Sequence, residues 1–426
     1  MTKKAEIYYF TLTDELPRED KLAWFKNTRF TNIDFDKINP DDKGNWLNLT
    51  DNDFDGLLPV CDKDVKAGKG EQAIFKMFSN GVATHRDEWV YDFDKNNLEN
   101  KIIFFIEIYQ ETLKNSSFKD KNLISWDSEL DSYAKRTIEK KFEENNIVES
   151  IYRPFMKKFF YFDKHFNGRT YQWGKIIGKN IKIIGFISGI AKPFSTLALS
   201  TISDLNMLSP AAGGTQCLPL YIYDKDGNPH DNITDWALSQ FQNHYIRTGS
   251  PEINKLDIFH YVYAVLHNPA YREKYEQNLK REFPRIPFYD DFEQWTEWGK
   301  QLMDLHLNYE TVEKYPLKRL NTPPIVKPKA KLKADKINRV IQLDDNTSLS
   351  GIPLSAWEYK LGNRSALEWV LDQYKEKKPK DPTIAEKFNN YRFSDYKEQV
   401  IELLMRVCTV SVETMKIIEA MKNRRE

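Results

Sequence analysis

The chain has 426 residues, which is too long for one small core and enough for two or three packed units. Its 63 basic and 63 acidic residues cancel, which argues against a uniformly basic, histone-like protein but leaves room for local concentrations of charge. A 14% aromatic content indicates that most of the chain folds. Three widely separated cysteines argue against a zinc ribbon or a disulfide framework and indicate a reduced, cytoplasmic protein. Lysines, glycines and a proline interrupt the most apolar stretch, residues 181–199, so no membrane span is expected.

The first third of the chain alternates short strands with helices. Residues 5–12 are β-branched and aromatic and predict a strand, and Pro17 opens a short helix. Residues 72–93 predict two short strands around a turn at residues 79–81. Apolar residues at helical spacing predict helices over residues 95–115 and 127–144.

The middle of the chain is expected to be rich in β-structure, and the remainder mostly helical. Runs such as IKIIGFISGI and CLPLYIY make residues 151–225 β-rich, and residues 231–310 have helical spacing. Residues 315–336 predict a Pro/Lys linker or edge segment, followed by a strand pair near 337–343. Two helices, about 355–375 and 394–423, end the chain. The expected fold class is α+β, with a β-rich core and a flanking helical scaffold.

No complete catalytic motif is found, and we assign no catalytic or metal-binding residue. The sequence has no GxxxxGK[ST] loop for ATP, and no glycine-rich turn of the kind that holds a dinucleotide or S-adenosylmethionine. His260 and His267 are seven residues apart, whereas a helical metal pair is spaced by three or four, so a packed helix face is expected there. The YDKDGN stretch predicts a tight turn between strands.

Charge is concentrated between residues 151 and 192. This segment has nine basic residues, one acid and many interleaved aromatics. Clustered cations of this kind neutralise phosphates, and Arg, Lys, Asn and Gln side chains near them read base edges. The alternative is a solvated face over an aromatic core. The predicted DNA-binding residues in this segment are Arg153, Lys157, Lys158, Lys164, Asn167, Arg169, Thr170, Gln172, Lys175, Lys179 and Lys192.

A second basic run covers residues 316–336, with seven basic residues and one acid. It fits a solvated linker or a strap that contacts phosphates, and the sequence leaves both open.

Several long strings resemble the C-terminal region of type ISP restriction-modification enzymes. Among them are IFKMFSNGVATHRDEWVYDF, YRPFMKKFFYFD, LDIFHYVYAVLHNPAYREKYEQNLKREFPRIPF and IPLSAWEYKLGNRSALEWVLDQYKEKKPKDPTI, and the resemblance covers residues 5–422. It implies a domain order of a methyltransferase tail and connecting segment (1–125), a target recognition domain (126–314), a linker with short strands (315–354) and a C-terminal helical segment (355–426). The Gly-x-x-Thr turn in residues 80–87 resembles the turn before the recognition region of related methyltransferases, which adds Thr84 and Arg86 to the predicted DNA-binding residues.

The resemblance implies that the chain recognises double-stranded DNA and carries no cofactor of its own. S-adenosylmethionine, ATP and magnesium are implied only for the full enzyme, whose methyltransferase and ATPase portion is the expected partner. The leading hypothesis is a sequence-specific DNA recognition module that positions a methyltransferase and a translocating nuclease. One alternative is the DNA-binding subunit of a split adenine-specific methyltransferase. Another is a protein that assembles with restriction subunits without contacting DNA.

Overall fold

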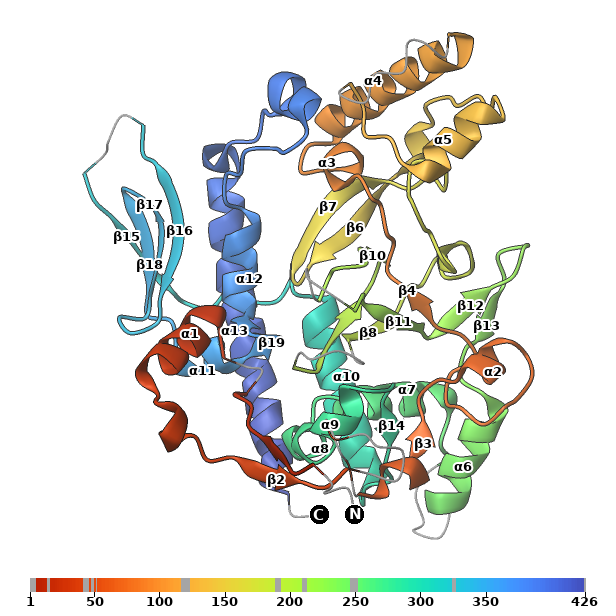
Figure 1. The fold of residues 1–426 in the computed structure, drawn as a ribbon, viewed down its shortest axis with the longest axis vertical. Coiled ribbons are helices and arrows are strands. Elements are labelled where there is room, and N and C mark those ends of the chain that lie inside the picture. The colour runs from red at the N-terminus through yellow and green to blue at the C-terminus, as the bar shows by residue number, and fades with distance from the viewer. Residues whose placement is uncertain are drawn as a thin grey trace.

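The computed structural model describes residues 5–13, 16–40, 46, 50, 52–115, 123–187, 193–208, 213–245, 252–323 and 327–424. Several small sheets lie between groups of helices, with α13 running through the middle of the view in Figure 1. Most of these sheets are antiparallel and the helices pack around them, so the predicted α+β class is confirmed.

The N-terminal part contains short elements. Its strand pair and helices are β1 (Ile7–Tyr9), α1 (Arg18–Asn27), a 3₁₀ turn (Phe30–Asn32), β2 (Asp36–Ile38), a 3₁₀ turn (Asp53–Gly56), β3 (Leu58–Pro59) and α2 (Lys63–Lys66). Strands β1 and β2 pair antiparallel, and β3 pairs with β14 (Arg285–Ile286) far along the chain. The predicted strand near residue 5 and the helix after Pro17 are present.

The first four-stranded sheet has the order β10-β6-β7-β5. Its strands are β5 (Tyr91–Asp92), β6 (Ile147–Arg153), β7 (Met156–Tyr161) and β10 (Ile202–Ser203). Helices α3 (Asp87–Val90), α4 (Lys95–Lys114) and α5 (Ser128–Lys135) lie beside it, and a 3₁₀ turn (Glu144–Asn146) leads into β6. The α4 helix begins where the Asp94 side chain accepts a hydrogen bond from Asn97 N, a standard N-cap.

The second four-stranded sheet has the order β4-β11-β8-β9 and lies between two hydrophobic cores. Its strands are β4 (Ser79–Asn80), β8 (Ile183–Ile187), β9 (Ser195–Leu199) and β11 (Gln216–Pro219). On β8, Ile183 and Ile187 join one core, whereas Ile184 and Phe186 join the other. Because both faces of β8 and β9 are covered, these strands have continuous apolar sequences.

A helical scaffold packs on the second core. It consists of α6 (Asp235–Tyr245), α7 (Lys255–Val265), α8 (Pro269–Lys274), α9 (Glu276–Leu279) and α10 (Phe292–Leu307). The hairpin of β12 (Tyr221–Tyr223) and β13 (Pro229–Asp231) precedes it, with the predicted tight turn between its strands. At Gly299 of α10, an added Cβ would lie 1.8 Å from the carbonyl oxygen of His260, so α7 and α10 pack in very close contact.

The C-terminal part forms a third four-stranded sheet and a helical hairpin. The sheet has the order β15-β18-β17-β16, with β15 (Lys318–Asn321), β16 (Ala330–Asp335), β17 (Val340–Asp344) and β18 (Thr347–Ser350). The hairpin contains α11 (Leu354–Glu358), β19 (Lys360–Leu361), β20 (Arg364–Ser365), α12 (Ala366–Gln373), a π-turn (Ile384–Phe388) and α13 (Phe393–Lys422). This region therefore contains more regular structure than the expected linker and strand pair.

Two other local expectations differ from the structure. Ser79–Asn80 forms the strand β4 rather than a hairpin turn, because it pairs with β11 through Cys217 and Gln216. The helix predicted over residues 127–144 ends at Lys135. Among the described residues, no helix is both long and apolar enough to cross a membrane.

Buried histidines connect the scaffold to the second sheet. Tyr263 of α7 accepts a hydrogen bond from Ala198 N (2.7 Å) and lies 2.5 Å from His306 Nδ1, so its hydroxyl donates to that nitrogen. The other ring nitrogen of His306 then donates to Thr414 Oγ1 on α13 (2.9 Å). Burial lowers the pKa of His306 to about 3, which keeps the ring neutral and suited to this chain of hydrogen bonds.

Candidate nucleic-acid interface

The loop between β7 and β8, residues 162–182, is anchored along one side by the segment that contains β4. Arg169 and Ala83 exchange two backbone hydrogen bonds, of 2.8 and 3.0 Å. Gly168 N donates to Thr84 O at 3.2 Å. An added Cβ at Gly168 would lie 2.2 Å from the His85 ring, so only glycine fits this close approach. These contacts fix the backbone of the β7–β8 loop at its centre.

A buried tryptophan anchors the second half of the loop. Trp173 is fully buried at the start of a 3₁₀ turn (Trp173–Lys175), and its Nε1 donates to Asn80 O at 2.9 Å. Beside it, Gln172 N donates to Ser79 Oγ at 3.1 Å. Tyr171 has a φ of 45° and a side chain that is 38% exposed. A bulky residue in this left-handed conformation costs about 1–3 kcal/mol, a cost often found beside functional side chains.

The cations of this anchored loop point to solvent. Lys164, Arg169, Lys175 and Lys179 are exposed, and within the described part of the chain none forms an ion pair with a carboxylate. Thr170 and Gln172 lie between them and are half-buried. The fold therefore brings these six predicted residues together on one loop, with donors and positive charge facing outward. The predicted Lys192 lies outside the described residues.

The cations of the β6–β7 hairpin are in different surroundings. Arg153 is buried, and its guanidinium lies 2.7 Å from the Asp204 carboxylate. Burial raises the pKa of Asp204 to about 7, against the opposing influence of Arg153. Lys157 lies 2.5 Å from Glu310 and 3.7 Å from Glu149. These two cations are thus occupied by carboxylates of the same chain.

Lys158 is held between aromatic rings. Its Nζ lies 4.5 Å from the ring centroids of both Phe93 and Tyr152, which is cation–π distance. Burial lowers the pKa of Lys158 to about 8, and the nearby Asp92 opposes that shift. Lys157 and Lys158 line a cavity of about 320 Å³ between the hairpin and α13. They lie apart from the exposed cations of the β7–β8 loop.

The remaining predicted residues lie beneath the loop. Arg86 is buried, donates to Phe166 O at 2.8 Å and pairs with Asp127 at 2.5 Å. Burial lowers its pKa and Asp127 opposes that shift. Thr84 is buried and donates to Asp87. Asn167 is buried and donates to Asp163 O at 2.8 Å and to Tyr161 O at 3.0 Å.

Sequence reasoning missed three polar residues that border the loop. The half-buried side chains of Asn80 on β4 and Gln216 on β11 are hydrogen-bonded to each other. The His85 side chain, 51% exposed, packs over Gly168 and lies 3.6 Å from Asp127. The Asn-Gly pair at residues 80–81 suggested a turn, and no local signal joins Asn80 to a residue 136 positions later.

The model of the Type ISP C-terminal specificity domain matches residues 73–403. The chain belongs to this family. The specificity domain is also similar to solved structures. A cryo-EM structure of a DrdV–DNA complex is 46% identical, with a TM-score of 0.85 over 99% of this chain. A nuclease-deletion mutant of the Type ISP restriction-modification enzyme LlaGI, in complex with a DNA substrate mimic, is 28% identical, with a TM-score of 0.78 over 98% of this chain.

A third similar structure is the ATP-dependent Type ISP restriction-modification enzyme LlaBIII bound to DNA, 28% identical with a TM-score of 0.76 over 90% of this chain. The specificity domain spans 44% of the DrdV chain, 39% of the LlaGI chain and 25% of the LlaBIII chain. No curated protein matches the sequence.

Proposed function

We propose that this specificity domain recognises a DNA sequence on behalf of a Type ISP restriction-modification enzyme, and that the β7–β8 loop makes the central contacts. The observation that carries the proposal is the contrast within one basic run. Its loop cations are exposed and unpaired on an anchored backbone, whereas its hairpin cations are already neutralised. The DNA-bound state of the three similar structures supports the same function.

Two kinds of contact are proposed for the loop. Lys164, Lys175 and Lys179 contact phosphates, which position the protein without selecting a sequence. Arg169, together with Thr170 and Gln172, reads base edges, because Arg pairs with guanine and Gln pairs with adenine in the major groove. Each good pair is worth about 1–3 kcal/mol of discrimination against a wrong base. A backbone fixed by Gly168 and Trp173 suits such reading, since donors must be held in place.

The buried members of the predicted set are assigned to positioning the loop. Arg86, Thr84 and Asn167 hold the backbone beneath Arg169 through the bonds described above. Arg153 joins β6 to the segment after β10 through Asp204. Direct phosphate contact by Lys157 and Lys158 requires their present partners to move. We therefore rank these residues below the loop cations as DNA contacts. Lys192 stays a prediction.

The rest of the enzyme is the proposed partner, either in the same polypeptide or as a separate subunit. The DrdV chain is more than twice as long as the part of it that this chain matches. We assign S-adenosylmethionine, ATP and magnesium to that other portion, and no cofactor to this chain. The split-methyltransferase alternative differs only in how the portions are connected. Mass measurement of the enzyme purified from its native cell distinguishes one long chain from two.

Fluorescence anisotropy with labelled DNA duplexes tests the proposed function. Wild-type protein is titrated into a random-sequence duplex pool, and bound molecules are recovered and sequenced over successive rounds. A recognition module enriches a defined motif, and Arg169→Ala relaxes the preference at one or two positions of it. Enrichment of no motif, or an identical motif from the Arg169→Ala protein, contradicts the assigned role of the loop.

A further inference from the structure

The third sheet, β15–β18, contains the second basic run of the sequence and is called the basic sheet below. One of its faces is apolar and fully covered. Ile341, Leu343 and Leu349 have no exposed surface and belong to the same core as Val370 of α12 and Leu404 of α13. In the view of Figure 1 the basic sheet lies on one side of α13 and the second sheet on the other.

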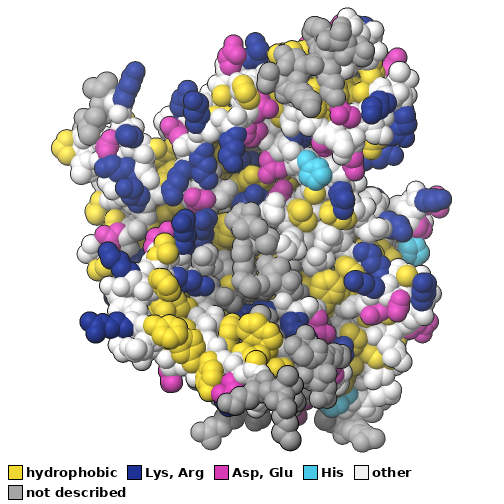
Figure 2. All heavy atoms as spheres, in the orientation of Figure 1, with side chains coloured by type: hydrophobic (Ala, Val, Ile, Leu, Met, Phe, Trp, Pro, Cys, Tyr) yellow, Lys and Arg dark blue, Asp and Glu magenta, His cyan; other side chains and the backbone are white. Residues whose placement is uncertain are grey.

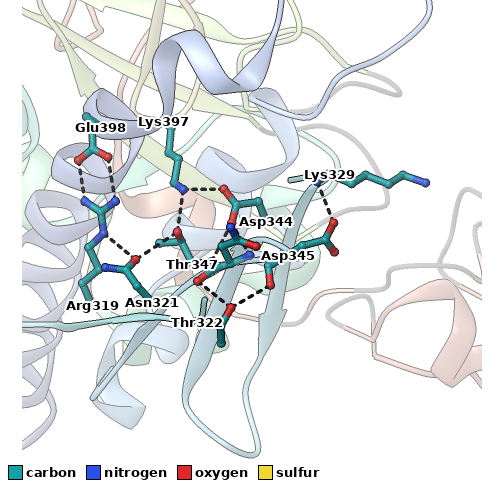
Figure 3. Close-up of polar contacts among 10 residues, drawn as sticks. Arg319, Asn321, Thr322, Lys329, Asp344, Asp345, Thr347, Lys397 and Glu398 are labelled. Carbon is teal, nitrogen blue, oxygen red and sulfur yellow. Dashed lines mark hydrogen bonds and ion pairs between the residues drawn. The ribbon is translucent and has the colours of Figure 1, made fainter. Parts of the chain in front are cut away.

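Charged contacts fasten the basic sheet to α13. Figure 3 shows Arg319 of β15 gripping the Glu398 carboxylate through two hydrogen bonds, of 2.7 and 2.9 Å. It also shows Lys397 of α13 reaching Asp344 at 2.6 Å and Thr347 at 2.7 Å. Both contacts lie along the covered side, so the sheet is held firmly and its other face is left to solvent.

The cations of the basic run divide into paired and unpaired groups. Arg319 pairs with Glu398, Lys331 lies 2.9 Å from Asp345, and Lys336 lies 2.8 Å from Glu368. In contrast, Lys318, Lys327 and Lys333 are exposed, and no ion pair involves them in the described ranges of the chain. Figure 2 shows Lys and Arg side chains gathered over this part of the molecule.

The strand register places two of the unpaired lysines on the solvent face. Leu320, Ser348, Gln342 and Lys333 lie opposite one another across the four strands, in a single row. The adjacent row on that face contains Lys318, Ser350, Val340 and Asp335. Asp335 is the one carboxylate of these eight residues, and it already accepts bonds from Asn338 N and Nδ2, at 2.9 and 2.8 Å. The face therefore offers cations and neutral donors, with its single acid engaged.

We propose that the solvent face of the basic sheet is a second DNA-binding surface, which contacts phosphates outside the segment read by the β7–β8 loop. This inference rests on the proposed function. With strands about 4.8 Å apart, Lys318 on β15 and Lys333 on β16 are separated by about 15 Å. A DNA strand carries a phosphate about every 3.4 Å along the helix axis, so this span covers roughly four nucleotides.

The chemistry of the surface fits a phosphate backbone better than base edges. Lysine is a flexible point charge that suits phosphates, and the serine and glutamine side chains between the two lysines donate hydrogen bonds to phosphate oxygens. Because the sheet is fixed to α13, its cations stay on one side of the molecule, at a constant place relative to the loop. The basic sheet then adds affinity and lengthens the DNA footprint without adding sequence information.

The test compares three matched triple variants of the full chain with wild type. The sheet variant is Lys318→Ala, Lys327→Ala and Lys333→Ala. The control variant removes three exposed lysines from other surfaces, Lys63→Ala, Lys69→Ala and Lys300→Ala. A rescue variant replaces the sheet lysines by arginine, which keeps the charge. Each protein is titrated by anisotropy with a 40-base-pair duplex and with a duplex trimmed to the selected motif, over a salt series. Thermal unfolding checks that all variants are folded.

The expected result is a loss of about 10-fold or more in affinity of the sheet variant for the long duplex, and a salt slope shallower by about 2.7, close to 0.9 per lost phosphate contact. The control and rescue variants bind as wild type does, and the trimmed duplex is bound equally by all. Wild-type affinity and slope in the sheet variant overturn the inference, and so does an equal loss on both duplexes. Failure of wild type to select any motif overturns the proposed function as well.

Discussion

The cations of the β6–β7 hairpin and those of the β7–β8 loop come from one run of sequence but meet different surroundings. In the hairpin, Arg153 lies against Asp204 and Lys158 lies between two aromatic rings. In the loop, Arg169 and Lys175 are exposed and unpaired within the described residues. Local density of positive charge is thus a poor guide to binding by itself, because a carboxylate distant in sequence decides which cations remain free. The predictions below test this contrast, ordered by their expected effect on stability.

The largest effect is expected at the buried pair. Asp204→Ala leaves the Arg153 guanidinium buried without its partner, which typically costs about 3–5 kcal/mol of unfolding free energy. The double variant Arg153→Met, Asp204→Leu removes both charges and is expected to be much less destabilised than Asp204→Ala. Urea denaturation followed by tryptophan fluorescence measures both. Equal stability of wild type and Asp204→Ala contradicts a structural role for this pair.

Acidification is expected to weaken the scaffold that supports the second sheet. Burial lowers the pKa of His306 to about 3 and that of His260 to about 4. A depressed pKa gives stability that is complete above the unfolded-state value, near 6.5, and that is lost as the pH falls below it. By pH 5 the loss is about 2 kcal/mol per histidine. Unfolding curves at several pH values measure it, and a flat profile between pH 7 and pH 5 contradicts the buried neutral state.

Two glycines of the β7–β8 loop provide an internal comparison. An added Cβ at Gly168 meets the His85 ring, whereas an added Cβ at Gly174 meets nothing within 4 Å. Gly168→Ala is therefore expected to cost about 1–3 kcal/mol through overpacking, and to weaken DNA binding without removing any charge. Gly174→Ala is the matched control and is expected to change neither. Indistinguishable behaviour of the two variants is evidence against an anchored loop.

The smallest effect on stability is expected at the exposed cations. Lys164→Ala, Arg169→Ala and Lys175→Ala each change the unfolding free energy by less than about 0.5 kcal/mol, since surface substitutions without partners usually do so. Their effect is on binding alone. A thermal shift as large as that of Asp204→Ala indicates a structural role and removes the distinction between loop and hairpin.

The sequence predicted the features that depend on neighbours in the chain. Apolar spacing gave the helix over residues 95–115, which is α4, and the β-rich character of residues 151–225 gave the strands between two cores. The family resemblance gave the specificity domain. The concentration of exposed cations around Arg169 was also foreseen.

Other features depend on partners far along the chain, and spacing alone does not reveal them. Ser79–Asn80 forms a strand only because β11 arrives beside it. Arg153 is neutralised by Asp204, and Lys157 by Glu310, 153 residues later. Similarly, residues 315–350 have the composition of a linker, but α12 and α13 supply the apolar surface on which they fold as a sheet.

The most direct test of the account is the salt dependence of DNA binding by the triple variant Lys164→Ala, Arg169→Ala and Lys175→Ala. If these three cations neutralise phosphates, the slope of log K against log salt becomes shallower than that of wild type by about 2.7, while stability is unchanged. A slope and affinity equal to those of wild type contradict the assignment of the β7–β8 loop to DNA.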